Sequence, residues 1–186
     1  MYSQYLKYLK GDIQRFNSTI EAFCSVSFIV TFWFRLTSWA YTKNRHLSIP
    51  LKLIYKLFQL ISGIQLPIGT RIGYGLSFFH YNCIVIAQQT IIGNNVSIHQ
   101  GVTIGRTFNG PKAGVPTIGN SVVIFAGAKI LGNVRIGNNA VIGANAVVVS
   151  DVPDNSVCVG VPGRIISNDS NRCFDSQWSI VFARYE

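Results

Sequence analysis

Residues 117–148 read TIGNSVVIFAGAKILGNVRIGNNAVIGANAVV, and an aliphatic residue stands at every sixth position of this stretch. The same register extends back to residue 86 with one interruption. Its members are Ile86, Ile92, Ile98, Ile104, Ile118, Ile124, Ile130, Ile136, Ile142 and Val148. Most of them follow a small or β-branched residue by two positions, as Val96 and Ala128 show. This period of six is neither that of an α-helix nor that of a plain strand.

A six-residue repeat of this kind predicts a solenoid. Each hexad makes one short strand and a turn, and it cannot bury its apolar side alone. Stacked hexads enclose a ladder of aliphatic side chains, while glycine and asparagine, such as Asn94 and Asn138, tolerate the left-handed backbone of the corners. We therefore expect a mainly β fold over residues 63–166.

The interruption predicts a projecting loop. From Ile104 to Ile118 the register steps by 14 residues instead of six, and the segment 105–117 is rich in glycine and proline. A long loop on a rigid scaffold is a common place for binding residues.

The pattern before residue 63 is helical, with segments expected at 2–9, 18–42 and 50–61, and residues 167–186 form a C-terminal tail. The uncharged run 22–34 is too short to span a bilayer, which requires roughly 20 residues. Two interpretations stay open: this segment packs on the main body, or it lies at a membrane surface.

The chain is basic, with 16 Lys and Arg against seven Asp and Glu, and residues 1–62 alone carry eight basic and two acidic residues. An anionic membrane, a phosphorylated ligand or nucleic acid would each suit this charge. A charged fraction of 12% disfavours a coiled coil, and four cysteines far apart exclude a zinc ribbon. They are typical of buried thiols in a reducing compartment.

Four stretches carry a family resemblance: 68–80 (IGTRIGYGLSFFH), 84–105 (IVIAQQTIIGNNVSIHQGVTIG), 125–153 and 160–166 (GVPGRII). They resemble the hexapeptide-repeat acyltransferases, in particular the serine O-acetyltransferase-like branch. The resemblance implies a left-handed parallel β-helix, a homotrimer and acetyl-CoA as donor, with no metal. The N-terminal part, with FWFRL at 32–36 and a basic helical lead, looks more like the members that modify sugars in surface polysaccharide synthesis.

The resemblance also implies site residues on the acceptor side. His80 matches the catalytic histidine, which as a neutral imidazole would take the proton from the attacking hydroxyl. A coil of three hexads, or 18 residues, would place position 98 over position 80, so His99 is expected beside His80. His99 is either a substrate contact or a solvated or interface histidine. Phe79 could line a sugar face, and Gln65 occupies a further acceptor-side position.

On the donor side, the resemblance implies that CoA lies between two subunits on backbone amides at coil corners. The matching positions are Gly105, Ala126 and Ala144, with Arg164 for the nucleotide phosphates and Lys129 as an outward-pointing cation.

Four positions depart from the serine enzymes. Gln65 and Phe79 stand where those enzymes have aspartates, and Gly114 and Val115 stand where their loop has an Arg–His pair. Because groups that would pair with a zwitterionic amino acid are missing, the sequence argues against free serine as acceptor.

We therefore expect a cytoplasmic O-acetyltransferase at the inner face of the membrane, with no nucleic-acid partner. It would act on a sugar hydroxyl of a capsule, exopolysaccharide, O-antigen or precursor. The alternatives are a serine O-acetyltransferase of cysteine biosynthesis and a non-catalytic hexapeptide-repeat assembly subunit. A zinc carbonic anhydrase needs three histidine ligands, and only His80 and His99 lie in the expected solenoid.

Overall fold

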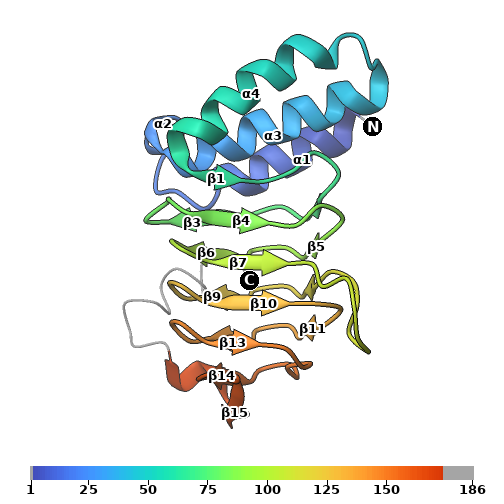
Figure 1. Ribbon diagram of the computed structural model, residues 1–186. Helices are drawn as coiled ribbons and strands as arrows, with labels where there is room; N and C mark the ends of the chain where they lie inside the picture. Colours follow the sequence, from blue (N-terminus) through green and yellow to red (C-terminus); the bar gives the residue numbers. More distant parts are fainter. Residues whose placement is uncertain (1, 174–186) are drawn as a thin grey trace.

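The structure is a computed structural model that describes residues 2–173. Within these residues, helices cover one end of the molecule and a stack of short strands forms the rest (Figure 1). The α-helices are α1 (Tyr2–Ile13), α2 (Thr19–Cys24), α3 (Val26–Lys43) and α4 (Ser48–Ser62). The helix expected over 18–42 is divided at Ser25, whose backbone is extended. Ser18 caps α2 by accepting a hydrogen bond from the amide of Glu21.

The strands form three sheets that run along the solenoid. The first contains β1 (Ile64–Gln65), β4 (Ile84–Ile86), β7 (Thr103–Gly105), β10 (Lys129–Leu131) and β13 (Val147–Val148). The second contains β2 (Arg71–Ile72), β5 (Ile91–Ile92), β8 (Thr117–Ile118) and β11 (Arg135–Ile136). The third contains β3 (Ser77–Phe79), β6 (Ser97–His99), β9 (Val123–Ile124), β12 (Val141–Ile142), β14 (Val157–Val159) and β15 (Arg164–Ser167). The short 3-10 helix Ser170–Cys173 follows.

All of these pairings are parallel except that of β14 with β15, which is antiparallel. The predicted fold is therefore confirmed as a mainly β parallel solenoid, consistent with a left-handed β-helix. All ten aliphatic residues of the six-residue register are at most 2% exposed and stack inside it. The small residues two positions earlier, including Val96 and Ala128, are also buried because the chain turns inward there.

The first coil is longer than 18 residues. Ser77 pairs with Ser97, a step of 20, whereas Val123 pairs with Val141, a step of 18. The two additional residues lie in the corner formed by 80–83, between β3 and β4. The expected stacking of position 98 over position 80 is therefore wrong: Ile98 pairs with Phe78, and His99 pairs with Phe79.

A buried ion pair joins the helices to the first coil. Arg35 on α3 contacts the carboxylate of Asp12 on α1 through two nitrogens, and it also donates to the carbonyl of Gly73 at 2.6 Å. Asp12 in turn accepts the amide of Gly75 at 2.7 Å. These bonds place α1 and α3 across the open end of the solenoid.

The apolar run 22–34 packs on the body of the protein, in agreement with one of the two expected arrangements. Phe28, Val30 and Phe34 are buried, and Trp33 stacks on Phe58 of α4 with ring centroids 5.4 Å apart. Of the helices described between residues 2 and 173, none is long and apolar enough to cross a membrane.

Candidate functional site

The corner 80–83 carries the predicted base in a left-handed backbone conformation. His80 has φ +49° and Cys83 has φ +51°, values that are uncommon for residues other than glycine. The corner is fixed from two sides: the carbonyl of Asn82 accepts the amide of Gly101 at 3.0 Å, and the amide of Ile84 donates to the carbonyl of Gly63 at 3.1 Å. The His80 side chain is exposed, and the corner that carries it is held beside Gly63 at the end of α4.

Gly63 allows the close approach between α4 and this corner. It ends α4 with φ +68°, and a Cβ at this position would lie 2.3 Å from Oδ1 of Asn82. The left-handed C-cap and the lack of a side chain are both necessary here. The helical layer and the His80 corner are thus one packed unit.

A column of aromatic rings runs beside His80 along the third sheet. Phe79, His99 and Phe125 stack on successive coils, with centroid distances of 5.2 Å and 5.0 Å. The His99 ring centroid lies 6.4 Å from that of His80. The sequence did not single out Phe125, although Phe125 follows His99 by one coil that is lengthened by the additional residues of the loop. The three rings form an apolar wall next to the predicted base.

His99 is buried and neutral at neutral pH. Burial lowers the pKa of His99, and the neighbouring His80 lowers this pKa further. The interpretation of His99 as a solvated histidine is therefore wrong, because only 7% of its surface is exposed. A neutral, stacked ring supports the wall and carries no charge toward a substrate. Its role as a substrate contact stays a prediction.

The other predicted acceptor-side residues, Phe79 and Gln65, lie in different positions relative to this corner. Phe79 belongs to the aromatic column, whereas Gln65 lies outside that column on β1, paired with Val85 of β4. Within residues 2–173 no hydrogen bond joins Gln65 to His80, so the group that orients the imidazole is not found among the described contacts.

Two of the predicted donor-side residues lie on the same edge as His80. The amide of Gly127 donates to the carbonyl of Gln100, and the amide of Asn145 donates to that of Ala126, so these corners follow one another. With a spacing of about 4.8 Å between coils, Ala126 and Ala144 lie roughly 10 and 14 Å from the His80 corner. Their own amides form no hydrogen bond to other described residues. They can therefore donate to an extended ligand, which is what an amide-lined pantetheine site requires.

The other predicted donor residues are more widely distributed. The ammonium of Lys129 donates to the carbonyl of Gly101, next to this edge. Arg164 is exposed on β15, the strand that follows β14 and pairs with it at the end of the third sheet. Gly105 is the last residue of β7, whereas the corner at Gly101 precedes the first residue of that strand, so the two lie on opposite sides of the first sheet.

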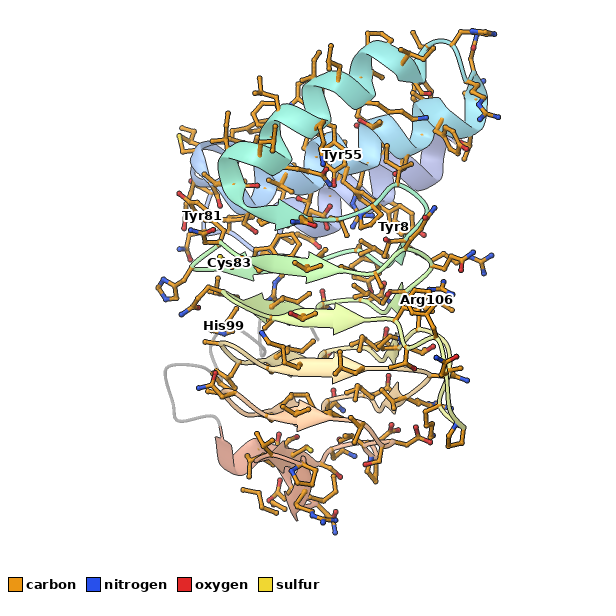
Figure 2. All side chains as sticks on the ribbon, in the orientation of Figure 1. Tyr8, Tyr55, Tyr81, Cys83, His99 and Arg106 are labelled. Carbon is orange, nitrogen blue, oxygen red and sulfur yellow. The ribbon has the colours of Figure 1, made fainter. Side chains whose placement is uncertain are left out.

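The loop 105–117 also lies away from His80 within one chain. Figure 2 shows His99 at one side of the solenoid and Arg106, at the start of the loop, at the other. The loop folds as a small finger in which Thr107 and Gly114 exchange two backbone hydrogen bonds. Lys112 fixes it to Asp151 at 2.9 Å. Gly105, Gly114 and Val115 cannot reach His80 of their own chain, so a site that combines them needs a second chain.

No group of three or more His, Cys, Asp or Glu side chains within residues 2–173 is placed to hold a metal ion.

Comparisons with known proteins identify the family. The model of the bacterial transferase hexapeptide (six repeats) matches residues 116–150. Serine acetyltransferase of Staphylococcus epidermidis is 36% identical over 174 residues, which cover 90% of this chain and 81% of that protein. Serine acetyltransferase of Synechococcus elongatus is 38% identical over 132 residues, which are 71% of this chain and about half (53%) of the relative.

The comparison with solved structures indicates the same family. Serine acetyltransferase of Neisseria gonorrhoeae in complex with serine superimposes with a TM-score of 0.77 at 32% identity, covering 89% of this chain and 70% of that one. The coenzyme A complex of serine acetyltransferase from Brucella abortus gives a TM-score of 0.79 at 30% identity, covering 90% and 69%.

These findings overturn the expected function. The relatives are serine acetyltransferases, so the prediction of a polysaccharide O-acetyltransferase is wrong, and the alternative of a serine enzyme is the better supported one. The misleading features were FWFRL at 32–36 and the basic helical lead. In the structure Trp33 stacks on Phe58 and Arg35 pairs with Asp12, so this motif serves helix packing. The chain belongs to the serine acetyltransferase family of hexapeptide-repeat O-acetyltransferases.

Proposed function

We propose that this protein transfers the acetyl group of acetyl-CoA to the hydroxyl of serine, with His80 as the general base. The observation that carries the proposal is the common edge shared by the exposed His80 corner and the free amides of Ala126 and Ala144. The relatives supply the substrates: their structures include complexes with serine and with coenzyme A.

The chemistry follows from this arrangement. His80 takes the hydroxyl proton as the oxygen attacks the thioester carbonyl, and the new C–O bond forms. The C–S bond then breaks, and the proton passes from His80 to the leaving sulfur. An acetylated hydroxyl and CoA-SH result, with no covalent intermediate on the protein. The aromatic column of Phe79, His99 and Phe125 excludes water from one side of the base.

Acetyl-CoA would run along the His80 edge toward the end of the solenoid. The amides of Ala126 and Ala144 would hold its pantetheine arm, Lys129 would add positive charge, and Arg164 would meet the nucleotide phosphates. Gly105 belongs to this site only as a residue of a neighbouring chain.

The proposed assembly is a homotrimer. Since Gly105 and the loop that follows it leave β7 on the side opposite to the corner that carries His80, each site would be completed by a neighbour. Sedimentation equilibrium should give a mass of about 62 kDa, three times the 20.6 kDa chain. A monomer at assay concentration would contradict both the trimer and the shared donor site.

The acceptor test uses thiol release from saturating acetyl-CoA. We expect turnover with L-serine and none with L-alanine, which lacks the hydroxyl. Because Gln65, Phe79, Gly114 and Val115 replace the charged groups of the family, we also expect a high KM for serine. The absence of thiol release at any serine concentration would overturn the proposal.

The variant Phe79→Asp tests whether position 79 contacts the acceptor. It restores a carboxylate next to His80, which can pair with the serine ammonium, and we expect kcat/KM for serine to rise about tenfold, equivalent to one charge-assisted hydrogen bond. Phe125→Asp is the matched control, since it disrupts the same column two coils from Phe79 and should bring no such gain. An equal change in both variants would show that the position next to His80 is not an acceptor contact.

A further inference from the structure

The outer face of α4 exposes a continuous apolar stripe. In Figure 1, α4 forms the outer, upper surface of the helical end and slopes down to β1. Leu53 is 76% exposed and Leu60 is 70% exposed, although both are large aliphatic residues. The stripe is made by Ile49, Leu53, Ile54, Leu57, Leu60 and Ile61. Their spacing of three, four, seven and eight residues places them on one side of the helix.

This stripe is not the face with which α4 packs on the protein. On the opposite side, Tyr55 is buried and its hydroxyl donates to the carbonyl of Leu66 at 2.7 Å. Gln59 donates to the same carbonyl at 2.8 Å, and Phe58 stacks on Trp33. A surface helix normally turns polar residues outward, and contiguous exposed apolar patches mark interaction sites. The stripe therefore needs an occupant from outside the chain.

The charges beside the stripe indicate what that occupant is. Lys52 and Lys56 follow one edge of it, while Lys43 ends α3 and Arg45 lies in the turn before α4. The helical region holds two acidic residues, of which Asp12 is buried against Arg35. Pairing two α4 helices would bring two strongly cationic layers together, whereas an anionic surface accommodates the lysines and the apolar stripe at once.

We propose that α4 docks this protein on an anionic lipid bilayer, with its stripe in the interface and Lys52 and Lys56 among the head groups. The helix lies in the membrane plane, and the solenoid stands away from it. The corner of His80 then lies directly under the membrane-facing layer, since Gly63 at the end of α4 packs on Asn82. This inference is independent of the acceptor.

Co-sedimentation with vesicles tests the proposal on the full chain. We expect binding to vesicles of equal parts phosphatidylglycerol and phosphatidylcholine at low salt, and weak binding to phosphatidylcholine alone. The variant Leu53→Glu/Leu60→Glu should lower the bound fraction at least tenfold. The variant Lys52→Gln/Lys56→Gln should weaken binding about fivefold for each lysine and reduce its salt dependence.

Ile166→Glu is the matched control, because Ile166 is 65% exposed on β15, at the other end of the solenoid. It should bind vesicles as the parent does, and circular dichroism checks that all variants are folded. Equal loss in the control, or unchanged binding of the stripe variant, would overturn the proposal. A third outcome would also overturn it: the parent does not bind vesicles but forms an assembly larger than a trimer, and Leu53→Glu/Leu60→Glu dissociates that assembly. The stripe would then join copies of the chain.

Discussion

The variant His80→Ala should fold as the parent does and lose roughly 100- to 10,000-fold in kcat/KM, the usual contribution of a general base. The fold should persist because the side chain is exposed and the corner is held by backbone bonds to Gly63 and Gly101. The loss should be in turnover rather than in acetyl-CoA affinity, since the proposed donor site is made of amides on later coils. Thiol release and thermal unfolding measure the two properties separately.

His99→Ala is the companion variant for this prediction. It removes the middle ring of the aromatic column and should lower activity less than His80→Ala does, because the neutral His99 ring is 6.4 Å from that of His80 and supports the wall. Near-normal turnover in His80→Ala, together with abolished turnover in His99→Ala, would show that the base has been assigned to the wrong histidine.

The repeat could be predicted from sequence because its cause is local and recurs. Each buried aliphatic residue of the register marks one strand and one corner, so ten matches in one register outweigh any single ambiguous segment. The length of the first coil could not be predicted in the same way. Its two additional residues fall in the corner 80–83, where the chain leaves the interior and no buried residue marks the register. For that reason the expected stacking of position 98 over position 80 is wrong, although His99 does lie beside His80, with ring centroids 6.4 Å apart.

The candidate site, like the fold, could be predicted from the sequence only in part. Single positions such as His80, Ala126 and Ala144 could be located from motif matches, because each occupies a coil corner. The distance of the loop from His80 depends on which sheet edge each corner occupies, and the linear sequence does not contain that information. The N-terminal motif does not indicate function by itself, because Trp33 and Arg35 are packing partners of Phe58 and Asp12.

The buried pair of Arg35 and Asp12 should be the most sensitive point for stability. Arg35→Ala leaves the Asp12 carboxylate, 1% exposed, without its cation and should lower the free energy of unfolding by about 3–5 kcal/mol. The carbonyl of Gly73 and the ring of Tyr8, 4.7 Å from the guanidinium, lose their partner as well. Chemical denaturation at neutral pH measures the effect. Lys112→Ala is the matched control: its ion pair with Asp151 is about half exposed and should contribute at most about 1 kcal/mol.

The pH dependence of the Arg35→Ala variant distinguishes an uncompensated charge from lost packing. Burial raises the pKa of Asp12 above its ordinary 3.8, and Arg35 opposes that shift, so removing Arg35 raises the pKa further. A carboxyl with a raised folded-state pKa binds more protons in the folded state, so stability falls as pH rises from the unfolded-state pKa to the folded-state one. The deficit of Arg35→Ala relative to the parent should therefore be smaller near pH 5 than at pH 7. The double variant Asp12→Leu/Arg35→Met, which removes both charges, should recover most of the loss at neutral pH. A deficit that is the same at both pH values and persists in the double variant would mean that Arg35 stabilises the helical layer by packing rather than by its charge.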